Sequence, residues 1–93
     1  MSKASARHIL VVSEAECLKL KQEIEGGKNF ADLARLHSKC PSGRRGGDLG
    51  EFSKGQMVPE FDKVVFTAEL NKVQGPVKTQ FGYHLLEVTK RSE

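Results

Sequence analysis

Two stretches, one near each end of the chain, have the hydrophobic pattern of β-strands. Residues 7–12 (RHILVV) are apolar and rich in β-branched side chains, and alternation along a strand places His8 and Leu10 on the same face. Residues 83–90 (YHLLEVTK) alternate clearly, which places His84 on a face with two apolar side chains. Each predicted strand therefore carries one histidine on a largely apolar face.

Between these strands, apolar residues recur every three or four positions in three stretches, which is typical of helices. The predicted helices cover residues 14–25, about 30–38 and 59–67. Ser13 and Glu16 form a capping box at the start of the first helix, and Asn29 can cap the second. Pro59 suits the first position of the third helix because no backbone N–H is needed there.

The segment between the second and third helices is rich in glycine. Residues 41–50 (PSGRRGGDLG) contain four glycines in ten positions, which predicts tight turns with positive φ angles instead of regular structure. Short strands are predicted at 49–52 and at 73–77, and Pro76 makes the second of these short or places it at a sheet edge. The order of elements predicts one α+β domain spanning residues 1–93, with helices packed around an antiparallel sheet.

Composition limits the classes of function. A chain of 93 residues that is 38% hydrophobic, with five Phe and no Trp, suits a small folded domain and not a disordered segment. The 15 Lys and Arg residues exceed the 12 Asp and Glu residues by three, and these charges are spread along the chain. A nucleic-acid partner is the least favoured interpretation, because no stacking aromatic residues stand beside the basic ones.

Location and assembly are also predicted from the sequence. No apolar run approaches the roughly 20 residues that a membrane helix needs. The first seven residues (MSKASAR) lack the apolar stretch of a secretory signal. We therefore expect a cytoplasmic monomer that makes no membrane contact.

The two cysteines do not form a recognisable metal or disulfide pattern. Cys17 and Cys40 are 23 positions apart and neither belongs to a C-x-x-C pair, so both are predicted to be free thiols. Cys17 lies on the apolar face of the first helix and is expected to be buried without a function. The histidines have no accompanying set of Cys or carboxylate ligands, so neither a metal nor a cofactor is expected.

The residues alone leave several roles open. Met57 and Phe61, four positions apart, fit an ordinary core as well as a binding pocket. Cys40 with a histidine is compatible with a thiol hydrolase, although no signature of that chemistry is present. Arg44 and Arg45 fit a solvated turn better than a site for an acidic substrate or phosphate.

Four segments together resemble the motifs of parvulins, and they occur in the order and at the spacing of that family. They are RHILV (7–11), HSKCPSGRRGGDLGEF (37–52), GQMVPEFDKVVF (55–66) and GPVKTQFGYHLLEV (75–88). The resemblance implies a four-stranded antiparallel sheet surrounded by about four helices, a parvulin/FKBP-like fold. It also implies a peptidyl-prolyl cis/trans isomerase that acts on proline-containing polypeptides and assists their folding.

Eight residues are candidates for the site. The resemblance implies that Met57 and Phe61 hold the proline ring, and we expect Leu49 and Phe81 to add further walls of the pocket. The polar centre would consist of His8, Cys40, Thr79 and His84. In it the two histidines pair, the threonine hydroxyl fixes a tautomer, and the cysteine faces the substrate carbonyl. We favour an electrostatic role for this thiol over a nucleophilic one, because parvulins also carry Asp at that position.

The sequence departs from the phosphate-directed branch of parvulins. That branch has a long basic loop after its first strand, whereas here only Val12 and Ser13 separate the predicted strand from the predicted helix. Phe81 also replaces a small polar residue of that branch. We therefore expect hydrophobic residues before proline to be accepted without phosphoserine selectivity. The main alternative is a non-catalytic module that binds proline peptides or acts as a chaperone.

Overall fold

The computed structural model describes residues 2–92 and contains a four-stranded antiparallel sheet, three α-helices and one short 3₁₀-helix, η1. The elements are β1 (Lys3–Val11), α1 (Glu14–Glu25), α2 (Phe30–His37), η1 (Pro41–Arg45), β2 (Asp48–Ser53), α3 (Pro59–Val65), β3 (Val73–Thr79) and β4 (Gly82–Ser92). The α+β class predicted from the order of elements is confirmed. None of the helices described for residues 2–92 is long and apolar enough to cross a membrane.

The two strands from opposite ends of the chain form the centre of the sheet, whose order is β2-β1-β4-β3. In the antiparallel pairing of β1 with β4, Leu10 lies opposite His84 and His8 lies opposite Leu86. Residues opposite each other in such a pair point to the same face, so both histidines lie on one face of the sheet. The predicted edge position of β3, which contains Pro76, is confirmed.

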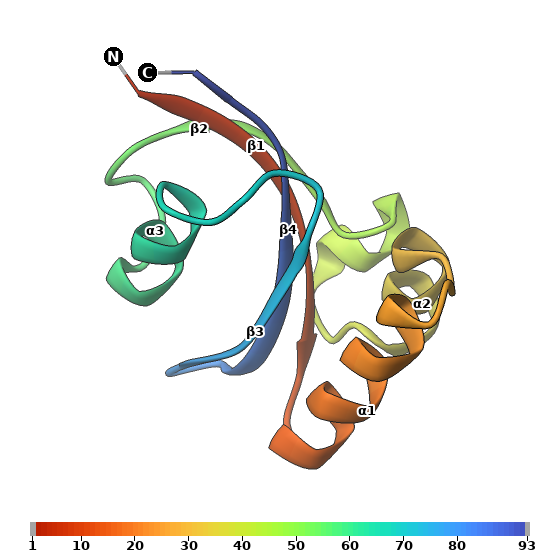
Figure 1. Cartoon of the computed structure of the whole chain (residues 1–93). Helices are drawn as coiled ribbons and strands as arrows, with labels where there is room; N and C mark the ends of the chain where they lie inside the picture. The colour runs from red at the N-terminus through yellow and green to blue at the C-terminus, as the bar shows by residue number, and fades with distance from the viewer. Residues whose placement is uncertain (1, 93) are drawn as a thin grey trace.

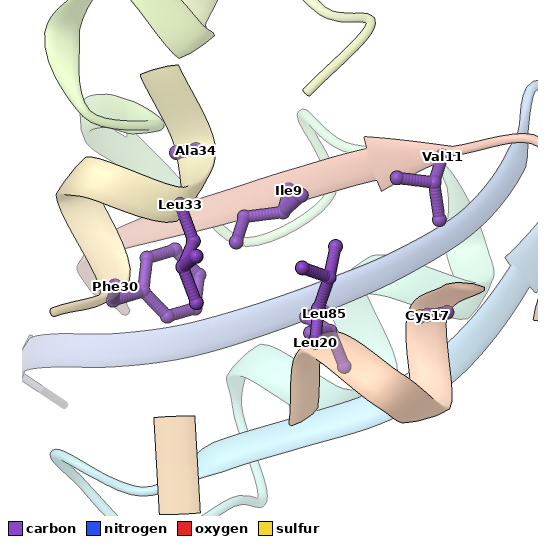
Figure 2. Packing of buried hydrophobic residues seen from close by; sticks show 8 residues of the cluster. All are labelled: Ile9, Val11, Cys17, Leu20, Phe30, Leu33, Ala34 and Leu85. Atoms are coloured by element: carbon purple, nitrogen blue, oxygen red, sulfur yellow. The ribbon is translucent and has the colours of Figure 1, made fainter. Parts of the chain in front are cut away.

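Helices cover both faces of the sheet, with α1 and α2 on one side and α3 on the other (Figure 1). Figure 2 shows side chains of α1 and α2 pointing toward Ile9 and Val11 of β1 and Leu85 of β4, all three fully buried. On the opposite face, Phe61 and Val65 of α3 pack in a second apolar cluster. The histidines share this second face, and the ring of Phe61 in α3 packs against both of them.

The local signals for helix ends operate as predicted. α1 has the predicted bounds, and the Ser13 hydroxyl accepts a hydrogen bond from the backbone N–H of Glu16 at 3.4 Å. The Asn29 side chain accepts one from the N–H of Asp32 at 3.0 Å at the start of α2. α3 begins at Pro59 and ends two residues before the predicted limit. These caps satisfy backbone donors that a helix leaves free at its first turn.

Two predictions of local structure need correction. The segment predicted to lack regular structure contains η1, because Pro41 starts a 3₁₀ turn and Gly46, with φ +71°, ends it. β1 also begins four residues earlier than predicted, at Lys3. Ala4 and Ala6 alternate inward in this extension, and both are almost fully buried. Alanine gives a weak strand signal, so the sequence pattern did not reveal them.

Candidate active site

The two histidines of the central strands contact each other on the face covered by α3. His8 Nδ1 and His84 Nδ1 are 3.1 Å apart, and the rings stack with centroids separated by 5.3 Å. Each side chain is only 5% exposed. Phe61 presents its ring edge-on to both, at 5.7 Å from each centroid. The register of β1 and β4 therefore creates a buried imidazole pair with an aromatic wall.

Thr79, the last residue of β3, holds the outer nitrogen of His84. Its Oγ1 lies 2.8 Å from His84 Nε2, and the same oxygen accepts a hydrogen bond from the Phe81 N–H at 3.2 Å. A hydroxyl can accept and donate at the same time, so Thr79 can accept from this N–H and donate its proton to the imidazole. The predicted contact between the threonine hydroxyl and a histidine is present.

Ser42 of η1 connects the other end of the histidine pair to Cys40, and the sequence analysis missed it. Its hydroxyl lies 3.0 Å from His8 Nε2 and donates a hydrogen bond to Cys40 Sγ at 3.3 Å. The side chain is buried, 4% exposed. No motif in the sequence pointed to this contact, because it depends on how η1 packs against β1.

Backbone hydrogen bonds at both ends of η1 bring Cys40 and Ser42 to His8. Before η1, the Lys39 N–H donates to the Leu10 carbonyl at 2.7 Å. After it, the His8 N–H donates to the Gly47 carbonyl at 2.9 Å. The 3₁₀-helix is thus fixed to β1 on either side, and its Ser42 side chain contacts His8.

One orientation of protons lets each of the two hydroxyls and the two imidazoles in this row donate once and accept once. Thr79 donates to His84, and His84 Nδ1–H donates to His8 Nδ1. His8 Nε2–H then donates to the hydroxyl of Ser42, which donates to Cys40 Sγ. The row is held by β3, β4, β1 and η1 and ends on a sulfur atom. Both imidazoles are neutral in this arrangement, with their protons on opposite types of nitrogen.

Burial keeps the pair neutral near pH 7. Desolvation lowers the pKa of His8 to about 4, and the neighbouring His84 adds a smaller lowering effect. Desolvation also lowers the pKa of His84. A proton on either ring would place a charge in an apolar environment, where no carboxylate of residues 2–92 forms a hydrogen bond with it.

An apolar cavity of about 350 Å³ opens beside the histidine pair. It is lined by His8, Leu10, Lys39, Cys40, Pro41, Leu49, Met57, Val58, Phe61, Phe81 and His84. All four predicted wall residues are among them, as are three of the four residues of the predicted polar centre. Thr79 does not line the cavity and reaches it through His84. The roles assigned to these residues stay predictions.

The walls of the cavity come from separate elements. Met57 precedes α3, so it does not share a helical face with Phe61, yet both line the cavity. Leu49 comes from β2, and Phe81, which is 60% exposed, lies in the turn between β3 and β4. A cavity of this size with a mostly apolar lining has the properties of a binding site for a small group.

The other residues considered in the sequence analysis do not line this cavity. Cys17 belongs to α1 and is fully buried, and desolvation raises the pKa of its thiol to about 11. Arg44 and Arg45 are exposed. Among residues 2–92, no group of three or more His, Cys, Asp and Glu side chains is placed to hold a metal ion.

Known proteins share both this fold and this sequence pattern. The chain is 45% identical over 89 residues to foldase protein PrsA 1 of Bacillus cereus, a match that covers 95% of this chain and 31% of that protein. The crystal structure of the peptidylprolyl isomerase PrsA from Bacillus anthracis superposes with a TM-score of 0.96 at 33% identity, covering 99% of this chain and 43% of the other. The chain thus spans about a third of the length of the foldase.

A single-domain relative matches over its whole length. The parvulin NmPin of Nitrosopumilus maritimus superposes with a TM-score of 0.87 at 33% identity, covering 97% of this chain and 98% of the other. The sequence model of the rotamase family, described as the PPIC-type PPIase domain, matches residues 6–90. The histidine pair, the apolar cavity and these matches agree, and the chain belongs to the parvulin family of PPIC-type peptidyl-prolyl cis/trans isomerase domains.

Proposed function

We propose that this domain accelerates rotation about X-Pro peptide bonds in polypeptides, with no selectivity for phosphoserine or phosphothreonine before proline. The observation that carries the proposal is the apolar cavity of about 350 Å³ bordered by the row of hydrogen-bonded side chains from Thr79 to Cys40. The cavity supplies a place for the proline ring, and the row supplies fixed dipoles at its side.

The chemistry needs twisting of a bond and no bond cleavage. Resonance holds the C–N bond planar with a barrier of about 18–20 kcal/mol. A twisted amide loses the charge separation of the planar form, so transfer from water to an apolar site destabilises the planar form more than the twisted one. Met57 and Phe61 would exclude water from the proline ring. Each lowering of the barrier by about 1.4 kcal/mol gives a roughly tenfold faster rate.

Cys40 acts in this scheme through its field. None of the hydrogen bonds described for residues 2–92 joins His8 to the thiol; Ser42 links the two and donates its hydroxyl proton to the sulfur. A thiol hydrolase uses a histidine in direct contact with the thiol as its general base, and this geometry differs from that arrangement. The sulfur, with Ser42 behind it, instead presents a polarised edge to the substrate amide.

The connection between β1 and α1 supports the proposed lack of phosphate selectivity. Val12 and Ser13 alone separate the two elements, so no basic loop extends from this end of β1 toward the cavity. Phe81, at the mouth of the cavity, offers an apolar surface to the residue before proline. Both features favour a hydrophobic residue such as leucine at that position.

The test measures cis-to-trans relaxation of short X-Pro peptides with Leu, Glu or phosphoserine before proline. We expect acceleration that is greatest for Leu. Met57→Ala removes one wall and should lower kcat/KM about tenfold, the effect of losing a buried side chain of this size. Phe61 is less suitable for substitution, because it is 3% exposed and also belongs to the core under α3.

Leu70→Ala is the matched control, because Leu70 is a partly exposed apolar residue outside the cavity. It should leave kcat/KM unchanged. Equal losses in both variants would mean that the cavity is not the catalytic site. If no peptide is accelerated but proline peptides still bind, the domain is a non-catalytic binding or chaperone module.

Monomeric state and cytoplasmic location are further parts of the proposal. Cys17 and Cys40 are both free thiols, and such thiols persist in a reducing compartment. Light scattering would test the first point and cell fractionation the second. A stable dimer, or recovery of the protein outside the cytoplasm, would contradict the respective part.

A further inference from the structure

A second hollow, of about 380 Å³, adjoins the apolar cavity and has a different chemistry. Its lining includes three cationic side chains, those of Arg35, Lys39 and Arg44, and no acidic one. The hollow shares Lys39, Cys40 and Pro41 with the apolar cavity. A substrate that fills the cavity therefore has the basic hollow beside it, across Cys40 and Pro41.

Two of the three cations are available for an external anion. Arg35 Nη1 already donates to Asp32 of the same helix at 3.0 Å. Lys39 and Arg44 are exposed and form no ion pair with the carboxylates of residues 2–92. From the sequence alone, Arg44 fits a solvated turn better than a site for an acidic substrate, but in the fold this residue lines the hollow beside the cavity.

The backbone that carries Lys39 is firmly attached to the sheet. The Lys39 N–H donates to the Leu10 carbonyl at 2.7 Å. The Ser38 hydroxyl accepts hydrogen bonds from the N–H groups of Leu10, at 3.1 Å, and Cys40, at 3.3 Å. This cation thus emerges from a segment fixed to β1, so its attachment point does not have to become ordered when a substrate binds.

We propose that this basic hollow is a substrate subsite that favours X-Pro segments with an Asp or Glu side chain within two residues of the proline. The inference rests on the proposed isomerase function, because it assumes that the proline occupies the apolar cavity. Successive residues of an extended peptide advance by about 3.3–3.6 Å, so a residue one or two positions away reaches an adjoining hollow. The residue directly before proline stays apolar.

The expected effect is modest and sensitive to salt. Ion pairs between exposed groups contribute little individually, so two cations should raise kcat/KM about three- to fivefold at low ionic strength. Screening shortens the reach of such charges to about 3 Å at 1 M salt, and the gain should disappear there.

The experiment compares glutamate with glutamine, its neutral isostere, in Leu-Pro peptides. Glu or Gln is placed two positions before the proline, one position after it or two positions after it, and the ratio of kcat/KM for Glu to that for Gln is measured with the full chain. We expect a ratio of about three to five at one of these positions at low salt. The Lys39→Gln, Arg44→Gln double variant should return that ratio to about one, because it removes both cations.

Lys19→Gln, Lys90→Gln is the matched control, because it makes the same change in net charge at exposed lysines away from both hollows. This variant should keep the ratio. Equal loss in both double variants would assign the effect to net charge and overturn the subsite, as would a ratio of one at every position in the wild type. A gain for phosphoserine far above that for Glu at the same position would overturn the assignment to carboxylates. Failure to accelerate any peptide would instead refute the isomerase itself.

Discussion

At the scale of single residues, the site depends on hydroxyl groups as much as on the histidines. Thr79 and Ser42 hold the outer nitrogens of the imidazole pair, at 2.8 Å and 3.0 Å. Without them each buried ring would have a nitrogen with no partner, and unpaired buried polar groups cost free energy. Within residues 2–92 every buried side-chain nitrogen and oxygen has a hydrogen bond. The two hydroxyls thus set which protons the histidines carry.

Ser42→Ala tests the row of hydrogen bonds. The substitution leaves His8 Nε2 unpaired and removes the donor to Cys40, so the free energy of unfolding should fall by about 1–3 kcal/mol and kcat/KM should also fall. If the row of hydrogen bonds sets the imidazole tautomers, breaking it at Ser42 should change the nitrogen-15 chemical shifts of both histidines in NMR spectra. A loss of stability alone would leave these shifts unchanged.

Ser53→Ala is the matched control for Ser42→Ala, because the Ser53 side chain makes none of the side-chain hydrogen bonds described for residues 2–92. It should leave both imidazole signals in place. If Ser42→Ala also leaves the tautomers and kcat/KM unchanged, the row is not a functional unit.

The sequence identified some residues of the site and missed one. The strand pattern placed each histidine on an apolar face, and the family motifs pointed to Thr79 and Cys40. Neither source revealed Ser42, because its role arises from the packing of η1 against β1, between residues more than thirty positions apart. Periodicity reports on one element at a time, so a contact made by an irregular segment leaves no periodic signal.

At the scale of elements, η1 is the part that sequence analysis described least well and that the site needs most. The segment follows α2, and the hydrogen bonds of Lys39 and Gly47 fix its two ends to β1. Gly47 has φ +84°, and a Cβ atom there would lie 2.3 Å from the carbonyl oxygen of His8. The close approach of η1 to the histidine strand thus requires a residue without a side chain.

Gly47→Ala should therefore disturb the site as well as the fold. Either β1 or η1 must move, so we expect the free energy of unfolding to fall by more than about 2 kcal/mol, since steric displacement adds to the cost of a left-handed backbone. Gly50→Ala is the control, because Gly50 has a similar φ of +72° but open space around it. It should cost about 1 kcal/mol and leave kcat/KM unchanged. Urea denaturation measures the free energy of unfolding, and the peptide assay measures kcat/KM. Equal losses in the two variants would contradict the close approach of η1 to β1 at Gly47.

At the scale of the whole molecule, two strands from opposite ends of the chain pair with each other. Each strand contributes one histidine to a buried ionisable pair on one face of the sheet. The pairing runs from Lys3 opposite Ser92 to Val11 opposite Tyr83 (Figure 1). Helices on both faces then exclude water from the centre of the sheet. The fold class and the first residues of the three α-helices followed from the sequence, because each depends on local patterns. The neutral histidine pair did not, because burial is a property of the assembled sheet.

Folding should therefore become less favourable as the pH falls. The pKa of His8 is about 4 in the folded protein and about 6.5 in an unfolded chain. Between these values the unfolded state binds more protons, so stability is complete above the unfolded value and is lost as the pH falls toward the folded one. From about pH 7 to about pH 5, His8 alone should lower the free energy of unfolding by about 2 kcal/mol. The lowered pKa of His84 acts in the same direction.

Urea denaturation at a series of pH values, in wild type and variants, separates this effect from the titration of surface groups. His8→Gln should make the dependence between about pH 7 and about pH 5 shallower, whatever its effect on absolute stability, because one of the two buried groups whose proton uptake differs between the two states is gone. Gln22→Ala, which changes an exposed side chain of α1 that does not titrate, should keep the wild-type slope. A wild-type slope in His8→Gln would mean that the pair is not held neutral by burial, and the charge assignment on which the proposed site depends would then be wrong.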